Sequence, residues 1–558
     1  MSIVAALFIT MQSFQEYLAA DGCDIIIRLL AKERVKQGGK NKLDRNSKSE
    51  IKPIMPPRDR WLRLRQSTRS KGLSKETANI LSIRKTIASD IKRFSNDMLN
   101  APKYLSKLFK FLNEITEMAA RRSSEIFSEK AFTIVPKFKE DDGQDAIYRP
   151  LCIYEDLKTK ILISAASSYF TQVFDPYLHE EILSYRPRRK YHNETTVTNG
   201  NHAIKGIREF VSSHKGETIY VAECDIQKFF DIINPDIVLE CFDRLALKAN
   251  IPGYEQARSV LKAYLDSYGF VPDVLSLNNE PAYWSMSRKK HKGKVKGQCL
   301  FKWVKEEGFL QAYTLEEFKL QRAHLGVPQG GALSCVISNV VLNDVDQCIV
   351  AEEDPDRFFA RYGDDIIMMH TNRSKCEELL EKYKQSLLEH KLIYHSFEDF
   401  SDLKDGVKNT KAFWKGKSKP VFLWGPGEGS ASEWIGFVGY EVRYDGITRL
   451  RISTLDKKFG DINKKYHKCL DSTQQDTQKL IASTIKRIES LPKSVEKFSE
   501  LKPNQYLGMQ MKSLDRYRHK KIAKLDRRLS KRHQTQANLI AHFEAKADVS
   551  FYWTIAEN

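Results

Sequence analysis

Residues 361–369, which read Arg-Tyr-Gly-Asp-Asp-Ile-Ile-Met-Met, constrain this chain more than any other stretch. Aromatic and branched residues on both sides predict two short buried strands. Gly363 and Asp364 predict the turn between them, because glycine adopts a positive φ without steric cost. Asp364 and Asp365 then lie at the tip of a buried hairpin, where two like charges require a cation such as Mg²⁺. A solvated turn is the alternative for an isolated Gly-Asp-Asp.

A third carboxylate follows another predicted strand, residues 218–225. With a period of two, Ile219, Val221, Glu223 and Asp225 share one face of that strand. Asp225 therefore lies at the carboxyl end of the strand. Beside Asp364 and Asp365 it would complete a two-metal site for in-line displacement at phosphorus.

A glycine-rich loop, Leu325-Gly-Val-Pro-Gln-Gly-Gly-Ala-Leu-Ser334, precedes an apolar stripe with helical spacing. Its glycines allow the backbone to approach a ligand closely, with Gln329 reaching a nucleotide. The alternative is a loop that only caps a buried helix.

Two further strands, residues 132–137 and 146–153, predict a hairpin around Gly143. Lys137 and Arg149 project from it. They are either surface cations or a clamp on a triphosphate, for which arginine supplies a bidentate fork and lysine a point charge.

The charge of the chain predicts a polyanionic partner. Lys and Arg outnumber Asp and Glu by 91 − 72 = 19, and neutralised phosphates release counterions. The basic charge is concentrated in residues 288–296 and near the C-terminus, where a predicted helix carries Lys520, Lys521, Lys524, Arg527 and Arg528. A solvated helix face is the alternative to phosphate contact there.

The nine cysteines contain no Cys-x-x-Cys pair, which favours a reducing cytoplasm and disfavours disulfides or a structural zinc site. We find no signal segment and no apolar run of membrane-spanning length, so a cytoplasmic protein without membrane association is expected.

With 558 residues, several domains are expected. We predict a basic helical N-terminal extension over residues 1–130, a mixed α+β unit over 131–450, and a helical basic unit over 451–558. Within the extension, residues 1–35 predict one or two helices interrupted at Gly22. Residues 36–72 predict a basic connector ordered on nucleic acid, with Trp61 docking it, and residues 74–128 predict further helices.

In their order, these motifs resemble the right-hand palm of reverse transcriptases. The resemblance is closest to the prokaryotic group with group II intron proteins, retron enzymes and antiviral-defence reverse transcriptases. It spans residues from about 131 to 452 and rests on six blocks in order: Arg149-Pro150-Leu151, Ser184-Tyr-Arg-Pro187, Asp225-Ile-Gln-Lys-Phe-Phe-Asp231, Gly326-Val-Pro-Gln-Gly-Gly331, Tyr362-Gly-Asp-Asp365 and Phe437-Val-Gly-Tyr440. It implies an α+β fold with fingers, an antiparallel palm sheet and a helical thumb.

The resemblance also implies roles for the metal and nucleic-acid ligands. Asp225, Asp364 and the carbonyl of Ile226 would hold two Mg²⁺ ions, with Asp365 supporting. The primer grip would comprise Phe437, Gly439 and Tyr440, and the basic residues of the thumb would contact the nucleic-acid backbone.

The nucleotide would lie among Lys137, Arg149, Phe230, Gln329 and Gly330. Phe230 is similar to a steric gate under the sugar. A viral RNA-dependent RNA polymerase would carry an acid there, so dNTPs, an RNA template and a DNA product are expected. A terminal-transferase-like or RNA-synthesising polymerase, or an RNA-binding maturase-like scaffold, are the alternatives.

Some departures narrow the resemblance. Gly363 stands where group II intron and retron enzymes usually have alanine, and neither a His/Cys-rich endonuclease nor the Val-Thr-Gly triplet of retron enzymes is found. The expectation is therefore a defence-associated enzyme. Its partners would be a dedicated non-coding RNA and, as open alternatives, an accessory defence protein or further copies of the chain.

Overall fold

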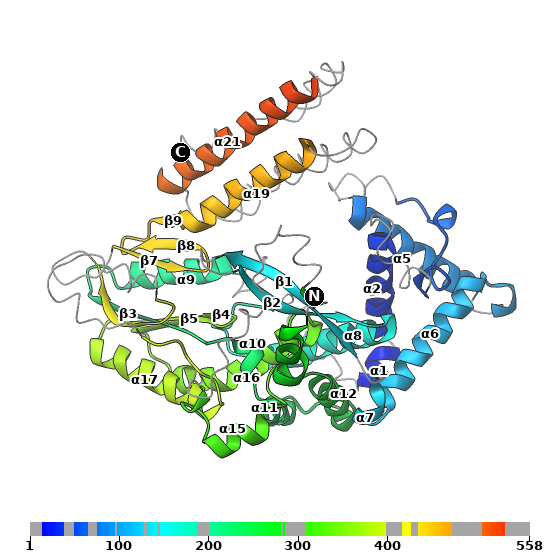
Figure 1. Ribbon diagram of the computed structural model, residues 1–558, viewed down its shortest axis with the longest axis horizontal. Helices are drawn as coiled ribbons and strands as arrows, with labels where there is room; N and C mark the ends of the chain where they lie inside the picture. The colour runs from blue at the N-terminus through cyan, green and yellow to red at the C-terminus, as the bar shows by residue number, and fades with distance from the viewer. Residues whose placement is uncertain are drawn as a thin grey trace, which may run out of the picture.

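The computed structural model describes residues 14–19, 21–37, 50–64, 75–94, 97–127, 131–141, 146–186, 200–280, 283–284, 309–397, 416–425, 433–470 and 505–530. The predicted basic run at 288–296 lies outside these residues. Figure 1 shows helices α2, α5 and α6 at one end of the molecule and a set of antiparallel sheets at the other.

A four-stranded antiparallel sheet, here the central sheet, holds the predicted Asp-Asp hairpin. Its order is β4 (Arg357–Tyr362), β5 (Asp365–His370), β3 (Ile219–Asp225) and β6 (Lys419–Trp424). Alternation along the strands separates two buried clusters. Val221 and Ile367 pack on the side of α9 (Gly200–Ser213), and Ala222 and Met368 join the larger cluster on the other side. The strands and their turn confirm the sequence prediction.

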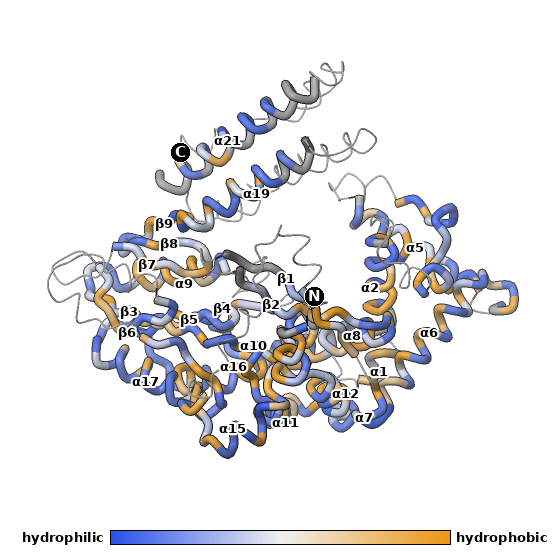
Figure 2. The backbone as a smooth tube through the Cα atoms, viewed as in Figure 1, coloured by the Kyte–Doolittle hydropathy of each residue, from blue (hydrophilic) through white to orange (hydrophobic). Residues whose placement is uncertain are grey.

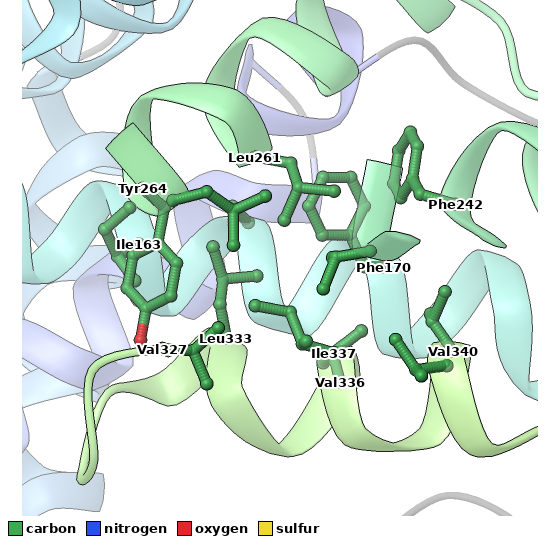
Figure 3. Close-up of a cluster of buried hydrophobic side chains, with 14 of the residues drawn as sticks. Ile163, Phe170, Phe242, Leu261, Tyr264, Val327, Leu333, Val336, Ile337 and Val340 are labelled. Atoms are coloured by element: carbon green, nitrogen blue, oxygen red, sulfur yellow. The ribbon is translucent and has the colours of Figure 1, made fainter. Parts of the chain in front are cut away.

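The larger cluster is built around α16 (Ala332–Val350), the helix predicted after the glycine-rich loop. Figure 3 shows its Leu333 and Ile337 among side chains of the neighbouring helices. These neighbours are α8 (Leu157–Phe174), α11 (Pro235–Ala249), α12 (Tyr254–Asp266) and α17 (Arg373–Glu389). Among the described residues, α16 is the one helix long and apolar enough to cross a membrane, although the sequence predicted no such run; most of it is buried inside the protein.

Several helices begin where the sequence places a capping residue. Asp156 accepts the amide of Thr159 at the start of α8, and Asn372 accepts that of Lys375 at the start of α17. Short elements complete this region: η4 (Asp175–Tyr177), α10 (Phe229–Ile232), the π-helical η5 (Phe270–Leu275), η6 (Ser276–Asn279) and α15 (Leu315–Gln321).

The predicted hairpin near the start of the mixed unit consists of β1 (Phe132–Asp141) and β2 (Ala146–Tyr154). The N-terminal helices are α1 (Phe14–Ala19), α2 (Asp21–Gln37), α5 (Lys75–Phe94), α6 (Lys103–Ala120) and α7 (Ser123–Ile126), with η2 (Arg58–Arg60) and η3 (Met98–Asn100) between them. They confirm the predicted helices, and their buried residues join the larger cluster.

Two details of this extension were predicted wrongly. Gly22 lies in the first turn of α2 and does not interrupt a helix. The connector is also packed over residues 50–64, where Ile51 and Met55 are buried, because apolar residues recur among its cations. Trp61 docks there as predicted, with Nε1 donating to the carbonyl of Pro56 at 3.0 Å.

The segment 434–443, predicted as strand throughout, is a hairpin of β7 (Trp434–Phe437) and β8 (Tyr440–Arg443). The turn falls at Val438 and Gly439, whose φ angles are 42° and 85°. Glycine makes such a two-residue turn accessible. β9 (Thr448–Leu450) adds a third strand.

Two long helices follow, α19 (Ile452–Leu470) and α21 (Gln505–Ser530), which lie side by side over the β7–β8–β9 sheet (Figure 1). The side chain of Gln510 fastens α21 to β9, accepting from the amide of Leu450 at 2.8 Å and donating to its carbonyl at 3.0 Å. Figure 2 shows many hydrophilic residues along both helices. The boundaries at residues 130 and 450 stay predictions.

A buried polar network supports the turn of the β4–β5 hairpin. Arg361 and Asp346 are fully buried, with Nε 2.6 Å from Oδ2. Arg361 Nη1 donates to the carbonyl of Gly363 at 3.2 Å, and the amide of Gly363 donates to Ser184 Oγ at 2.8 Å. Asn339 of α16 donates to the carbonyl of Ser184 at 3.0 Å. The turn is thus held from the helix below it and from the segment before it.

Replacing Arg361 with methionine leaves the buried Asp346 carboxylate without its partner. We expect the free energy of unfolding to fall by about 3–5 kcal/mol, measured by urea denaturation. The exposed pair of Arg373 and Glu377 on α17 is the control, and Arg373→Ala should cost below about 0.5 kcal/mol. Equal losses in the two variants would contradict the role given to the buried pair.

Candidate active site

The three predicted acidic residues meet at one end of the central sheet. Asp225 and Asp365 are opposite each other in the β3–β5 register. Asp364 precedes Asp365 in the turn, next to Gly363, whose φ of 73° lies in the left-handed region. Asp225 is the last residue of β3 and Asp365 the first of β5, so antiparallel pairing alone brings these two residues together.

The acidic residues perturb one another. Burial raises the pKa of Asp365 to about 7, and the charges of Asp225 and Asp364 add to this effect. Burial and Asp225 also raise the pKa of Asp364, while the positive charges of Lys417 and Arg149 oppose the increase. Such mutual repulsion is the electrostatic signature of a site that a divalent cation would neutralise.

Lys417 lies against Asp225, with Nζ 2.9 Å from Oδ2. His395 Nε2 is 3.7 Å from the same oxygen. Burial and Lys417 lower the pKa of His395 to about 4, so this imidazole is neutral near pH 7. Lys417 was not predicted from the sequence, because residue spacing does not show which distant cation reaches a strand end.

The backbone carbonyl of Ile226 is directed toward the acidic residues. Ile226 bridges Tyr394, but the hydrogen bonds beside it run from His395 to the carbonyl of Asp225 and from Gln227 to the carbonyl of Ile393. In an antiparallel pair, the polar groups of Ile226 then point to the opposite side of the strand. That side is the one on which β5 pairs with β3.

These donors fit a hard divalent cation. Mg²⁺ prefers carboxylate and carbonyl oxygens and keeps several sites for water and phosphate. Asp225, Asp364, Asp365 and the carbonyl of Ile226 are such a set. The ammonium group of Lys417 already compensates one of these charges.

The nucleotide subsite predicted from the glycine-rich loop lies between this loop, β2 and α10. The amide of Cys152 in β2 donates to the carbonyl of Gln329 at 2.9 Å. Gly330 has a φ of 90°, and a Cβ there would be 2.5 Å from Leu151 Cδ1. Phe230 is half-buried and packs edge-on against Phe229, with ring centroids 5.2 Å apart. Glycine is therefore required at position 330 by close packing as well as by backbone conformation.

Lys137 and Arg149 are opposite each other in the β1–β2 register, and both are exposed. The charge of Arg149 lowers the pKa of Asp364 and of Asp231. Arg149 is therefore close enough to influence both the acidic residues and the nucleotide subsite.

The predicted primer-grip residues lie at the tip of the β7–β8 hairpin. Phe437 is buried, and the carbonyl of Gly439 accepts the amide of Arg451 at 3.1 Å. A Cβ on Gly200 would be 3.3 Å from Val438 and 3.6 Å from Tyr362. The tip therefore approaches the β4–β5 hairpin at the start of α9.

The basic residues predicted on the last helix are described in part. Lys520 and Lys524 are exposed on α21, whereas Lys521 Nζ donates to Asn463 of α19 at 2.6 Å. The side chains of Arg527 and Arg528 lie outside the described residues.

One group of metal-ligating side chains was not predicted. Among the described residues, Cys241, Asp344 and His390 form the one group of three whose ligand atoms all lie within 4.8 Å of one another. Arg244 Nη2 is 2.6 Å and His390 Nε2 2.9 Å from Asp344 Oδ2. The hydrogen bond from His390, with help from Arg244, lowers the pKa of Asp344 to about 2. Ion pairing accounts for this cluster, whose members come from three helices and share no sequence motif.

Residues 136–396 match the family described as "Reverse transcriptase (RNA-dependent DNA polymerase)". No curated protein matches the sequence. The chain thus contains a reverse transcriptase domain, and its enzyme class is that of RNA-directed DNA polymerases. Its fold combines helices with antiparallel sheets, as the sequence predicted.

Solved telomerase structures show a distant likeness. Apo telomerase from Candida tropicalis is 12% identical with a TM-score of 0.32, covering 99% of this chain and 90% of that one. The same enzyme with a TWJ fragment of telomeric RNA is 12% identical with a TM-score of 0.34, covering 89% and 75%. Telomerase from Candida albicans with such a fragment is 10% identical with a TM-score of 0.30, covering 87% and 76%. Scores this low do not by themselves establish a shared architecture.

We predict that Mg²⁺ stabilises the protein more at about pH 8 than at about pH 5.5, since metal binds deprotonated carboxylates. Without metal, the increase in the pKa of Asp365 from 3.8 to about 7 makes stability fall as the pH rises between these values. Added Mg²⁺ should therefore raise the melting temperature by a few degrees at the higher pH. The measurement is thermal unfolding with and without Mg²⁺.

Asp365→Asn is the matched variant, in which the pH dependence of the Mg²⁺ effect should be smaller. Equal stabilisation of the wild type at the two pH values would contradict the assignment of these carboxylates as ligands.

Proposed function

We propose that this chain is a Mg²⁺-dependent reverse transcriptase that extends a primer with dNTPs through a two-metal site. The observation that carries the proposal is the convergence of Asp225, Asp364 and Asp365 at one end of the central sheet, where burial and mutual repulsion raise the pKa of two of them. A reverse transcriptase domain over residues 136–396 supports it.

In this proposal Asp225, Asp364 and the carbonyl of Ile226 hold the two ions, and Asp365 supports them. When bound, the ions lower the pKa of the primer hydroxyl and neutralise the leaving pyrophosphate. Lys417 leaves Asp225 as the ions bind, because both compensate the same charge. The chain otherwise contributes position and charge, which is where catalysis of phosphoryl transfer mainly lies.

The triphosphate is bound by Lys137 and Arg149 on facing strands of the β1–β2 hairpin. Both side chains are exposed, so they are accessible to a substrate that enters from solvent. Phe230 lies beneath the sugar, and Gln329 with Gly330 forms the floor beside it. The primer end rests on Phe437, Gly439 and Tyr440.

The template–primer duplex lies against α19 and α21. Lys520 and Lys524 present their charges to solvent on α21, and such residues bind phosphates without reading sequence. We propose the same contact for Lys521, Arg527 and Arg528.

We further propose that the template is a dedicated non-coding RNA and that the enzyme acts in antiphage defence in the cytoplasm of a prokaryote. The order of the six sequence blocks supports the prokaryotic group, and Gly363 supports the defence-associated enzymes within it. An accessory defence protein, or association of several copies of the chain, would belong to the same proposal.

We predict that Asp364→Asn reduces dNTP incorporation by at least about a hundredfold, because it removes a metal ligand. The protein is purified with its co-purifying RNA and supplied with Mg²⁺ and labelled dNTPs. Sequencing of RNA and product should show DNA complementary to one enriched RNA. In infected cells, the same variant should lose protection against phage.

Glu352→Gln, an exposed change on the loop before β4, is the control and should keep both activities. Product without a matching template would favour terminal-transferase chemistry. Full activity of Asp364→Asn would contradict the proposed enzyme, and phage protection that survives loss of synthesis would favour a scaffold.

We predict that Phe230→Ala raises incorporation of rNTPs relative to dNTPs by about tenfold or more, because a small side chain no longer clashes with a 2′-hydroxyl. The measurement is the ratio of kcat/KM for rNTP and dNTP. A wild type that already prefers rNTPs, or a ratio unchanged in the variant, would contradict the gate and favour an RNA-synthesising polymerase.

A further inference from the structure

Asp231 is a buried carboxylate to which the two-metal chemistry gives no role. It is 6% exposed and lies on α10, the single turn of helix that follows β3. Its Oδ1 accepts a hydrogen bond from Gln329 Nε2. Burial raises the pKa of Asp231 to about 7, although Gln329, Lys228 and Arg149 all oppose the increase. A carboxylate kept under these conditions, beside a nucleotide subsite, requires an explanation.

Gln329 is held at two points. Its backbone carbonyl accepts the amide of Cys152 in β2 at 2.9 Å, and its side-chain nitrogen is bound by Asp231. The amide oxygen, Oε1, is left to face a ligand. A glutamine amide has a donor end and an acceptor end that exchange on rotation, whereas an ionised carboxylate only accepts. The charge on Asp231 therefore selects one of the two amide orientations.

The backbone around this pair is also joined. The amide of Val327 donates to the carbonyl of Phe230 at 2.8 Å, and that of Gly326 donates to the carbonyl of Ile233 at 2.7 Å. These bonds connect α10 to the glycine-rich loop on both sides of Asp231. The proposed steric gate and Gln329 are thus positioned by the same short segment.

We propose that Asp231 is a positioning residue that orients the Gln329 amide so that Oε1 accepts a hydrogen bond from the 3′-hydroxyl of the incoming dNTP. This inference rests on the proposed function, because it assumes that the subsite receives a dNTP. A dideoxynucleotide lacks that hydroxyl and would leave Oε1 without its partner. Discrimination between a dNTP and the matching ddNTP therefore reports directly on the orientation.

The experiment compares kcat/KM for dTTP and ddTTP in the wild type, Asp231→Asn, Gln329→Met and the double variant. Asparagine keeps the shape of Asp231 but can donate as well as accept, so it no longer selects an amide orientation. We expect the wild type to prefer dTTP by about tenfold, and we expect this preference to approach unity in all three variants. A general loss of structure would lower both rates and leave their ratio unchanged.

The double variant decides whether Asp231 acts through Gln329. If it does, adding Asp231→Asn to Gln329→Met causes no further loss of preference. A preference unchanged in Asp231→Asn, or losses that multiply in the double variant, would overturn the inference. Asp243→Asn, the same change at a carboxylate paired with Arg258, should keep the wild-type ratio.

If Asp231→Asn does not fold, the pH dependence of the ratio decides the question. The charged and titratable groups facing Asp231 are Arg149, Lys228, Cys152 and Tyr268. At saturating Mg²⁺, the wild-type preference should fall as the pH decreases below about 7, where Asp231 takes up a proton. Gln329→Met should show no such dependence, and a flat wild-type profile would overturn the inference.

Failure of the proposed function is recognised separately. If the wild type incorporates neither nucleotide, protection against thermal unfolding by dTTP and by ddTTP replaces the rates. Stronger protection by dTTP that is lost in Asp231→Asn would still support the positioning role, and equal protection in the wild type would overturn it.

Discussion

The buried ion pair of Arg361 and Asp346 is the interaction on which the rest of the site depends. It places a guanidinium under the turn of the β4–β5 hairpin, where it also donates to the carbonyl of Gly363. Two adjacent aspartates at a hairpin tip repel each other, and the strands alone would not hold the turn against that repulsion. Because the pair anchors the turn to α16, the most buried helix of the central region, the acidic residues are fixed to the core before any cation arrives.

A second constraint connects the parts that handle the nucleotide. The segment 230–233 pairs with residues 326 and 327, the side chain of Asp231 binds Gln329, and the carbonyl of Gln329 binds Cys152 of β2. The hairpin with Lys137 and Arg149, the glycine-rich loop and the end of β3 are therefore joined through one residue. The same logic holds at the other side of the site, where the carbonyl of Gly439 binds the amide of Arg451 ahead of α19. Hydrogen bonds of the backbone, which do not depend on side-chain flexibility, set these distances.

The sequence predicted best where a local pattern was strong. The apolar strands around Asp364, the helix after the glycine-rich loop and the hairpin of β1 and β2 were all evident from residue spacing. It failed where one residue changes the meaning of a pattern. The segment 434–443 alternates like a strand, yet Val438 and Gly439 turn it back on itself. Gly22 was read as a break, but the first turn of a helix tolerates glycine.

Some things were therefore determined by the sequence alone: the chemistry of the acidic residues, the identity of the strands that carry them, and the glycines that permit close approach. These are local properties, since they depend on side-chain type and on backbone conformation within a few residues. Only the tertiary structure decided the partners: Arg361 with Asp346, Lys417 with Asp225, and Asp231 with Gln329. The members of the last two pairs are far apart in the chain, and burial determines which opposite charges or hydrogen-bonding groups must meet. That requirement arises from the cost of leaving a polar group without a partner in the interior, which exists only once the chain has folded.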